Sequence, residues 1–231
     1  MTAEILPSEV LKLRNIPFNE SFICMFSGGK DCGLALSMAL QKSKAVALIH
    51  CLDKDNHTSL FHEQTEDIVQ AQANAFNIPI VYKNYKWWVR WDKIVKMYKE
   101  YKENGVKYVV FGDLRAEGNV DTQIKLCKSA GLIPCIPLYF LPYDYLINEM
   151  EKRNIQSIIT TITHPSIGSE WLGRFFDRQA YEHFKQIGVD PFGENGEFHT
   201  TLINADFFNK PFQYDILDNN GKKITIRPKS E

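Results

Sequence analysis

The sequence predicts an α/β protein built on a doubly wound, five-stranded parallel sheet, followed by a small C-terminal β-rich subdomain. The first observation behind this prediction is that short apolar runs, typical of buried strands, alternate with longer segments of helical periodicity. The second is a change after about residue 164, where glycines become frequent and short strand-like runs follow one another. Parallel sheets bind their ligands at the carboxyl ends of the strands, near the point where the strand order reverses.

The elements of the sheet follow from apolar spacing along the first two thirds of the chain. Five apolar runs are expected as its strands: residues 22–27, 45–51, a run beginning at 78–81, 108–111 and 155–161. Helices are expected between them over residues 31–41, 61–77 and 87–104, and over a segment containing Val120, Ile124 and Cys127. Gly131 is placed to end the last helix, because glycine adopts the left-handed C-cap conformation without strain.

Further β elements are expected near the C-terminus. Residues 198–203 alternate as a strand, and residues 214–218 and 224–227 flank Asn219-Asn220-Gly221, a favoured hairpin turn. We therefore predict three parts: an N-terminal arm over residues 1–20, an α/β domain over 21–165 and a small substrate-binding subdomain over 166–231.

The composition is that of an ordinary globular protein. Hydrophobic residues make up 44% and charged residues 24% of the 231 residues, and the net charge is −1. This balance gives no global electrostatic signal for a nucleic acid or an acidic membrane as partner. The sequence shows no signal peptide and no apolar run long enough to cross a membrane, and its five cysteines form no C-x-x-C pair. We therefore expect a cytoplasmic protein with reduced thiols.

The stretch FSGGKDCG at residues 26–33 is the main functional signal. It joins the first predicted strand to the first predicted helix, where glycines let a ligand approach the backbone and the helix N-terminus attracts an anion. A G-x-x-x-x-G-K-[ST] loop is excluded, because Cys24 stands six residues before Lys30 and Asp31 follows it. A G-x-G-x-x-G dinucleotide loop is excluded because the two glycines are adjacent.

The remaining pattern, S-G-G-K-D, resembles the PP-loop of the ATP pyrophosphatase superfamily, which cleaves ATP between the α- and β-phosphates. The superfamily signature is S-G-G-x-D-S, and Cys32 stands here in place of the last serine. The resemblance implies an adenine nucleotide α-hydrolase-like fold that uses ATP and Mg²⁺. We expect the Lys30 ammonium to stabilise the leaving pyrophosphate. The residues expected to bind the nucleotide are Ser27, Gly28, Gly29, Lys30, Asp31 and Cys32.

A second motif narrows the resemblance. Residues 188–200 read GVDPFGENGEFHT, and residues 111–115 read FGDLR. Together with the glycine-rich loop they resemble the diphthine–ammonia ligase family over about residues 22–208. The resemblance implies a ligase that activates a carboxylate as an acyl-adenylate, releases pyrophosphate, and then forms an amide with ammonia and releases AMP. Its partners would be ATP, ammonia and a carboxylate on a protein or a small molecule.

Glu194 and Glu197 lie three residues apart in this second motif and are candidates for catalysis. Ammonia is mostly protonated at neutral pH, so the site must hold a cation and accept a proton, which carboxylates can do. Mg²⁺ binding is an equally open role, and we assign a magnesium site to Asp31 and Glu197. A solvated loop is the alternative for both glutamates.

Neighbouring segments supply the remaining candidates. Gly112 and Asp113, after the fourth predicted strand, are expected to bind the nucleotide or metal, although Asp113 equally suits the cap of the next helix. At two positions the sequence departs from the family pattern, which suggests a different carboxylate, such as a corrinoid side chain. The candidate substrate-binding residues are Arg174, Asn195, Gly196 and His199, of which Asn195 and His199 are the departures.

Two other classes of protein stay open. A PP-loop enzyme of tRNA thiolation would need thiols, for which Cys32 and Cys135 are candidates. Segment 82–108 mixes basic and aromatic residues, but its aromatic stripe falls on one helical face, which favours packing over RNA contact. The other class is a nucleotide-binding module that does not consume ATP. We expect no nucleic acid or membrane as partner, and a homodimer is compatible with the sequence. The stripe consists of Trp88, Trp91, Val95 and Tyr98.

Overall fold

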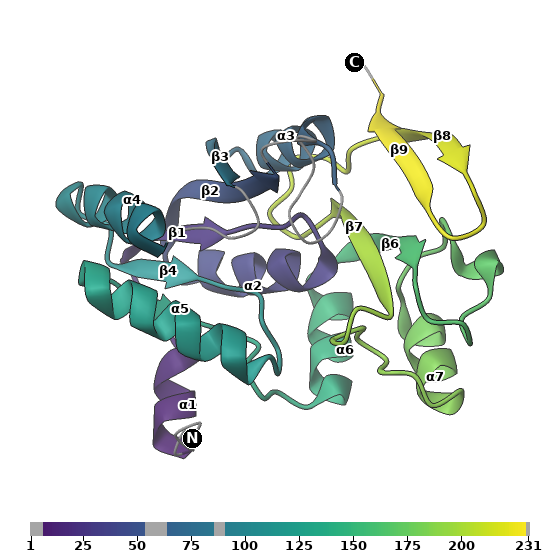
Figure 1. The fold of residues 1–231 in the computed structure, drawn as a ribbon, viewed down its shortest axis with the longest axis horizontal. Helices are drawn as coiled ribbons and strands as arrows, with labels where there is room; N and C mark the ends of the chain where they lie inside the picture. Colours follow the sequence, from purple (N-terminus) through teal and green to yellow (C-terminus); the bar gives the residue numbers. More distant parts are fainter. Residues whose placement is uncertain (1–6, 54–63, 86–90, 230–231) are drawn as a thin grey trace.

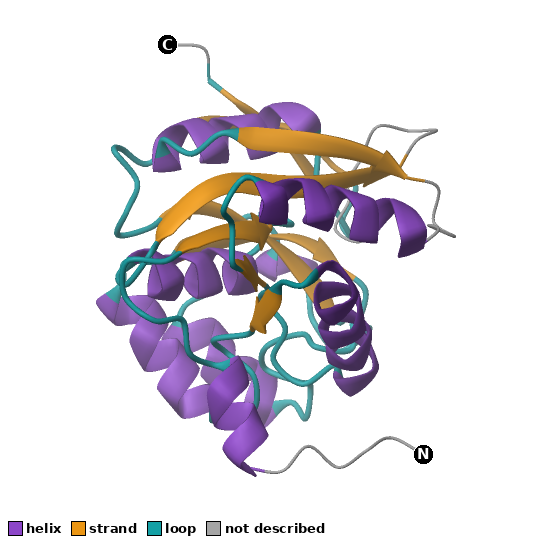
Figure 2. Cartoon of the chain, turned by 90° about the vertical axis from the view of Figure 1, so that its left-hand side faces the viewer, coloured by secondary structure: helices purple, strands orange, loops and turns teal. Residues whose placement is uncertain are grey.

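The structure is a computed structural model that describes residues 7–53, 64–85 and 91–229. A five-stranded parallel sheet forms its centre, with helices on both faces (Figures 1 and 2). The strand order is β3-β2-β1-β4-β5, so the order reverses between β1 and β4 and the doubly wound α/β prediction is confirmed. The strands are β1 (Ser21–Met25), β2 (Lys44–Asp53), β3 (Ile80–Tyr85), β4 (Tyr108–Val110) and β5 (Ile133–Cys135).

Two hydrophobic clusters on opposite faces of the sheet hold the helices. Successive side chains of β1 alternate between them: Phe22 and Cys24 belong to one cluster and Ile23 to the other. The first cluster includes apolar residues of α2 (Lys30–Leu40) and α3 (Glu66–Phe76). The second includes residues of α4 (Trp91–Glu103) and α5 (Glu117–Ala130). Gly131 ends α5 with φ of +73°, as the sequence predicts.

The fifth strand of the sheet is not the one that the sequence analysis assigned. Residues 155–161 were expected there, but the structure places β6 (Gln156–Ile162) in a separate antiparallel pair with β7 (Phe198–Asn204). The fifth position belongs to β5, whose three residues include Pro134. Proline is tolerated at the edge of a sheet, but it hides a strand of this length from pattern analysis. An apolar run also does not reveal which sheet it joins.

The C-terminal part forms two small antiparallel sheets with helices packed beside them (Figure 1). The predicted strand over 198–203 is confirmed as β7, and the predicted hairpin is confirmed, with φ of +80° at Gly221 in its turn. The proposed boundary at residue 165 stays a prediction. The elements of this part beyond β6 and β7 are α6 (Tyr143–Lys152), η1 (Ser169–Trp171), α7 (Arg178–Gln186), β8 (Tyr214–Asn219) and β9 (Ile224–Pro228).

The expected N-terminal arm contains α1 (Pro7–Leu13), which lies near β5. The backbone N–H of Ile136, just after β5, donates to the carbonyl oxygen of Leu13 (2.6 Å). The arm therefore packs against the edge of the sheet. In the part of the chain that the structure describes, no helix is long and apolar enough to cross a membrane.

The aromatic stripe on α4 packs only in part against the sheet. Tyr98 is 1% exposed and Val95 packs against the second cluster, as predicted. Trp91 is 56% exposed, so the prediction was wrong for this residue, which begins the helix and lies beyond the packed turns. Trp88 lies outside the described residues.

Candidate active site

The glycine loop, residues 26–29, joins β1 to α2 where the strand order reverses. Gly28 has φ of +85°, a conformation that glycine adopts without steric cost. Its carbonyl oxygen accepts hydrogen bonds from the Leu202 N–H and from Gln72 Nε2, both at 2.9 Å. A Cβ at Gly28 would lie 2.3 Å from Gln64 Oε1, so a side chain does not fit. The loop is therefore held by both α3 and β7.

Gly112 brings the segment after β4 into contact with the start of α2. A Cβ at Gly112 would lie 2.8 Å from the backbone nitrogen of Cys32, which leaves no room for a larger residue. The sequence predicted that Gly112 and Asp113 lie at this edge of the sheet, and they do. Asp113 Oδ2 accepts a hydrogen bond from Gln123 Nε2 of α5 (2.8 Å). It is not the N-cap of α5, which is Ala116.

Ser27 and Cys32 contact each other across the turn. The Ser27 hydroxyl donates to Cys32 Sγ (3.1 Å), and the Gly29 N–H donates to Ser27 Oγ (3.4 Å). Burial raises the pKa of the Cys32 thiol to about 11, and burial raises that of Cys135 to about 12. Both thiols are therefore protonated at neutral pH, which disfavours thiolate chemistry at either residue.

Lys30 is 4% exposed and points toward the C-terminal part of the chain. Its ammonium donates to the carbonyl oxygen of Phe192 (2.6 Å) and to Asp31 Oδ2 (2.7 Å). Three phenylalanine rings lie 5.2 to 5.4 Å from the ammonium, which is cation–π distance. Its backbone N–H donates to Thr200 Oγ1 (3.1 Å). The rings belong to Phe176, Phe192 and Phe198.

Three carboxyl groups, which we call the acidic group, lie around the start of α2: Asp31, Asp113 and Glu194. The side chain of Asp31 is 25% exposed as a whole, but its Oδ1 is buried without a hydrogen-bond partner. Burial raises the pKa of Asp31 against the influence of Lys30, and burial also raises that of Asp113. Burial and the nearby Asp31 carboxylate raise the pKa of Glu194 to about 7. Glu194 Oε2 accepts a hydrogen bond from the Arg115 N–H (3.0 Å).

Glu197 bonds within its own glycine-rich segment. Its carboxylate accepts hydrogen bonds from the backbone N–H of Asn195 (2.9 Å) and from Asn195 Nδ2 (3.0 Å). Gly193 and Gly196 on either side have φ of +74° and +84°, which shapes the tight turn. None of these bonds joins Glu197 to Asp31, the residue with which it was expected to share Mg²⁺.

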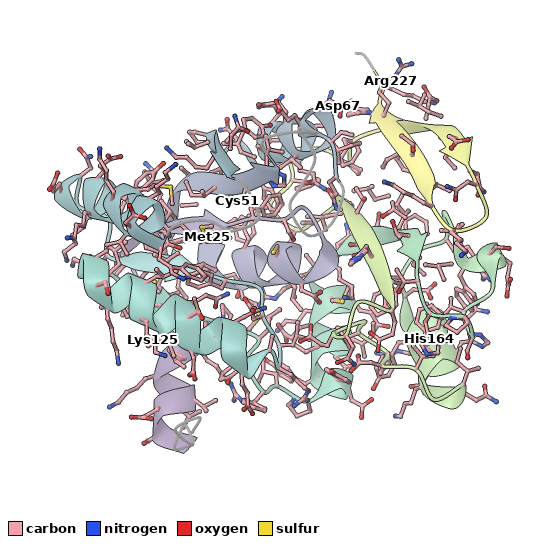
Figure 3. The ribbon with its side chains drawn as sticks, viewed as in Figure 1. Met25, Cys51, Asp67, Lys125, His164 and Arg227 are labelled. Carbon is pink, nitrogen blue, oxygen red and sulfur yellow. The ribbon has the colours of Figure 1, made fainter. Side chains whose placement is uncertain are left out.

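The other expected substrate residues lie in the C-terminal part. Arg174 is exposed, with its guanidinium 4.4 Å from the ring of Trp171 and donating to Gln179 Oε1 (3.2 Å). His199 is half-buried on β7, opposite Thr161 of β6. Figure 3 labels His164 in this part, well to the right of Met25, the last residue of β1. The structure thus unites the loop, Asp113 and Glu194 more closely than it does Arg174.

Several contact residues were missed by the sequence analysis. Arg115 belongs to the quoted FGDLR motif but received no role, although its N–H binds Glu194. Thr200 and Phe192 follow the same pattern: they lie in the second motif and contact Lys30. Their membership of a motif was the available signal. Gln64 and Gln72 carried no signal, because isolated glutamines on a helix are common on surfaces.

Two family models match the chain and together cover most of it. The diphthamide synthase N-terminal domain matches residues 20–134, and the diphthamide synthase C-terminal domain matches residues 142–223. The chain belongs to the diphthamide synthase family. This confirms the resemblance to the diphthine–ammonia ligase family and the PP-loop superfamily. Membership of the diphthamide synthase family supports an ATP-dependent, ligase-like role.

The other comparisons add little. A search of curated proteins finds no match. Among solved structures, a chain described as a predicted subunit of tRNA methyltransferase from Methanocaldococcus jannaschii is 14% identical, with a TM-score of 0.42. The match covers 83% of this chain and 99% of that chain. We draw no functional conclusion from a likeness this low.

Proposed function

We propose that the protein is an ATP-dependent, AMP-forming amide ligase that activates a carboxylate as an acyl-adenylate and amidates it with ammonia. The family and the glycine loop support the use of ATP. The observation that carries the proposal is Glu194, which lies close to Asp31 at the start of α2 and has a pKa raised by burial to about 7. A carboxyl group with this pKa accepts and returns protons readily at neutral pH.

The first step is assigned to the glycine loop. A carboxylate oxygen of the substrate attacks the α-phosphorus of ATP, the bond from this phosphorus to the α,β-bridging oxygen breaks, and pyrophosphate leaves. Charge accumulates on the phosphate oxygens, and we assign its stabilisation to the Ser27 hydroxyl and to the N-terminus of α2.

Asp31 is the residue that best fits Mg²⁺, because its Oδ1 is buried without a hydrogen-bond partner. Within residues 7–53, 64–85 and 91–229, no group of three or more His, Cys, Asp or Glu side chains is arranged to hold a metal ion. Proteins commonly hold Mg²⁺ through one or two carboxylates together with phosphate oxygens, so Asp31 and the nucleotide suffice. Bound there, the ion would neutralise charge on the phosphates. The role of Glu197 in binding Mg²⁺ stays a prediction.

The second step is assigned to Glu194. Ammonium must lose one proton before it attacks the acyl carbon, and the nitrogen must lose a second proton as the amide forms and AMP leaves with the electrons of the acyl C–O bond. Glu194 is half-buried, so its carboxyl can take each proton in turn and pass it to water. The Arg115 N–H fixes its Oε2 in place. Free ammonia, or an amine from a partner, is the proposed nucleophile.

The carboxylate is proposed to be that of a protein or of a small molecule. The unusual residues Asn195 and His199 lead us to include substrates other than diphthine, such as a corrinoid side chain. The proposed role of Glu194 is the same for both kinds of substrate, because the proton leaves the incoming nitrogen.

The proposal can be tested by following α-labelled ATP in native-source extract fractions, with and without ammonium. We expect AMP that requires ammonium, an extract fraction and Glu194, because a glutamine at this position cannot accept a proton. General-base catalysis contributes about 10²–10⁴-fold, so Glu194→Gln should lower AMP formation by that order. Asp218→Asn, in the exposed strand β8, is the matched control and should leave the rate unchanged.

Other outcomes of this assay would replace the proposal. AMP that requires a sulfur donor and RNA would indicate tRNA thiolation. Tight ATP binding without AMP under any condition would indicate a nucleotide-binding module. A Glu194→Gln variant with the wild-type rate would remove Glu194 from the mechanism.

A further inference from the structure

Lys30 lies in the signature loop, yet its side chain is committed to the C-terminal part of the chain. Its ammonium binds the carbonyl oxygen of Phe192, and its backbone N–H binds Thr200. A buried ammonium must be paired and hydrogen-bonded, and Asp31 completes the pairing here. To reach a phosphate, the ammonium would have to leave the Phe192 carbonyl and the three rings around it.

The segment that Lys30 holds, residues 190–194, is anchored on its other side by Tyr143 of α6. Asp190 Oδ1 accepts the backbone N–H groups of Phe192 (2.8 Å) and Gly193 (3.0 Å). Asp190 Oδ2 accepts the Tyr143 hydroxyl (2.9 Å). The Tyr143 ring also stacks on the Phe192 ring, with centroids 4.8 Å apart. The segment is thus clamped between Lys30 and Tyr143.

Glu194 follows Phe192 by two residues, so the clamp determines where its carboxyl group lies. The guanidinium of Arg115 lies 4.6 Å from the Tyr143 ring, and the Arg115 N–H binds Glu194. The same network therefore reaches both the backbone before Glu194 and the donor to its carboxyl group. Geometry alone connects Lys30 to the proposed proton acceptor.

We propose that Lys30 is a positioning residue, whose ammonium ties the Phe192 carbonyl to the start of α2 and thereby sets the position of Glu194. This inference rests on the proposed function for its consequence, but the clamp itself does not. The charged groups that act on Glu194 agree with it: Lys30 on α2 lowers its pKa, while Asp31 on α2 and Asp113 after β4 raise it. Lys30 thus also opposes the repulsion within the acidic group.

The test compares Lys30→Met with the wild type in two measurements that need no carboxylate substrate. Hydrogen–deuterium exchange reports the amides of Phe192 and Gly193, and calorimetry with a non-hydrolysable ATP analogue reports nucleotide affinity. We expect these amides to exchange about tenfold faster or more, because local opening becomes easier. We expect the Kd for the analogue to stay within about threefold of the wild-type value, which is a small change in binding free energy.

Turnover supplies the third measurement. A displacement of about 1 Å at a catalytic group can cost about 10²-fold, so we expect AMP formation to fall by that order in Lys30→Met. The double variant Lys30→Met/Glu194→Gln should be little slower than Glu194→Gln alone, because both changes remove the same function. Additive losses would contradict a role through Glu194.

Tyr143→Phe tests the clamp from its other side, without touching the glycine loop, and serves if Lys30→Met fails to fold. It removes the hydroxyl that binds Asp190 and should give the same pattern, with faster exchange at Phe192 and unchanged nucleotide affinity. Tyr145→Phe is the matched control, because it removes a hydroxyl from an exposed tyrosine (43%) of the same helix.

Two results would overturn the proposal. One is a large loss of nucleotide affinity in Lys30→Met with unchanged exchange at Phe192, which would make Lys30 a phosphate ligand. The other is unchanged exchange in both Lys30→Met and Tyr143→Phe. Failure of the proposed function is distinguishable, because it would appear as missing ammonium-dependent AMP in the wild type while the exchange result still held.

Discussion

The glycine loop and the segment 193–197 are both glycine-rich turns with left-handed residues, but they are held in place differently. The loop is fixed by distant elements: Leu202 and Gln72 bind the carbonyl of Gly28. The later segment is held by itself, through the bonds from Asn195 to Glu197. A turn fixed by its surroundings resists displacement, whereas a self-contained turn keeps its shape and moves as a unit. The second turn therefore depends on few anchors for its position.

The largest expected effect breaks the loop at Gly28. In Gly28→Ala the new Cβ would lie 2.3 Å from Gln64 Oε1 and 2.6 Å from Gln72 Oε1, at φ of +85°. We expect loss of ATP binding and a decrease in unfolding free energy larger than the roughly 1–2 kcal/mol that a left-handed conformation costs by itself. Calorimetry and denaturant unfolding measure the two effects.

Gly196→Ala is the matched variant in the other turn. Gly196 has nearly the same φ, +84°, but no atom lies within 4 Å of the place that a Cβ would occupy there. Its expected cost is therefore the conformational one alone, about 1–2 kcal/mol, with ATP affinity preserved. Equal losses in the two variants would mean that the surroundings of Gly28 do not matter.

The pH dependence of the reaction sharpens the comparison next, because Glu194 lies where the two turns meet. Burial raises its pKa to about 7, and the proposed base is the deprotonated form. The rate should therefore rise with pH through about 7 and fall about tenfold per unit below it. AMP formation measured from pH 5 to 9, a range of about four units around this pKa, tests the sign. Glu194→Gln should lose this limb of the profile, and a limb that persists would belong to another group.

A smaller effect is expected for Glu197→Gln. The Glu197 carboxylate binds only Asn195 in the bonds described above, and a glutamine oxygen can keep one of them. We expect a decrease in AMP formation of about tenfold or less, because one charge-assisted bond is weakened. A decrease as large as that of Glu194→Gln would make Glu197 a catalytic or metal-binding group, as the sequence analysis allowed.

The smallest effect is expected for Cys32→Ser. The thiol accepts the Ser27 hydroxyl and its pKa of about 11 keeps it protonated, so a hydroxyl of similar size can replace it. We expect AMP formation to change by less than about twofold, as surface-like substitutions without a lost interaction do. A severe decrease would instead indicate thiol chemistry at this position.

The sequence predicted the parts of the fold that depend on local patterns. The loop after β1, the switch-point position of Gly112 and the C-terminal hairpin all follow from short stretches whose residue types have one structural solution. The fifth strand was assigned wrongly, because Ile133–Cys135 is too short and contains proline, while the longer run at 155–161 pairs with β7 instead.

The candidate site could be predicted as a set of segments, but the partners within it could not. Lys30 and Phe192 are 162 positions apart in the sequence, and no periodicity connects them. Burial and the surrounding charges set the pKa of Glu194, so its value requires the folded chain. The association of Glu197 with Asn195 in place of Asp31 likewise depends on how one turn closes on itself.

The close approach at Gly112 has a consequence for how the two chemical steps are joined. With no side chain between Gly112 and the backbone of Cys32, the start of α2 and the segment carrying Asp113 and Arg115 touch as two rigid surfaces. A shift of the helix as phosphate binds would be passed on to the residue that holds Glu194. The distance between the group that is activated and the group that accepts the proton is then fixed by the absence of a single methyl group.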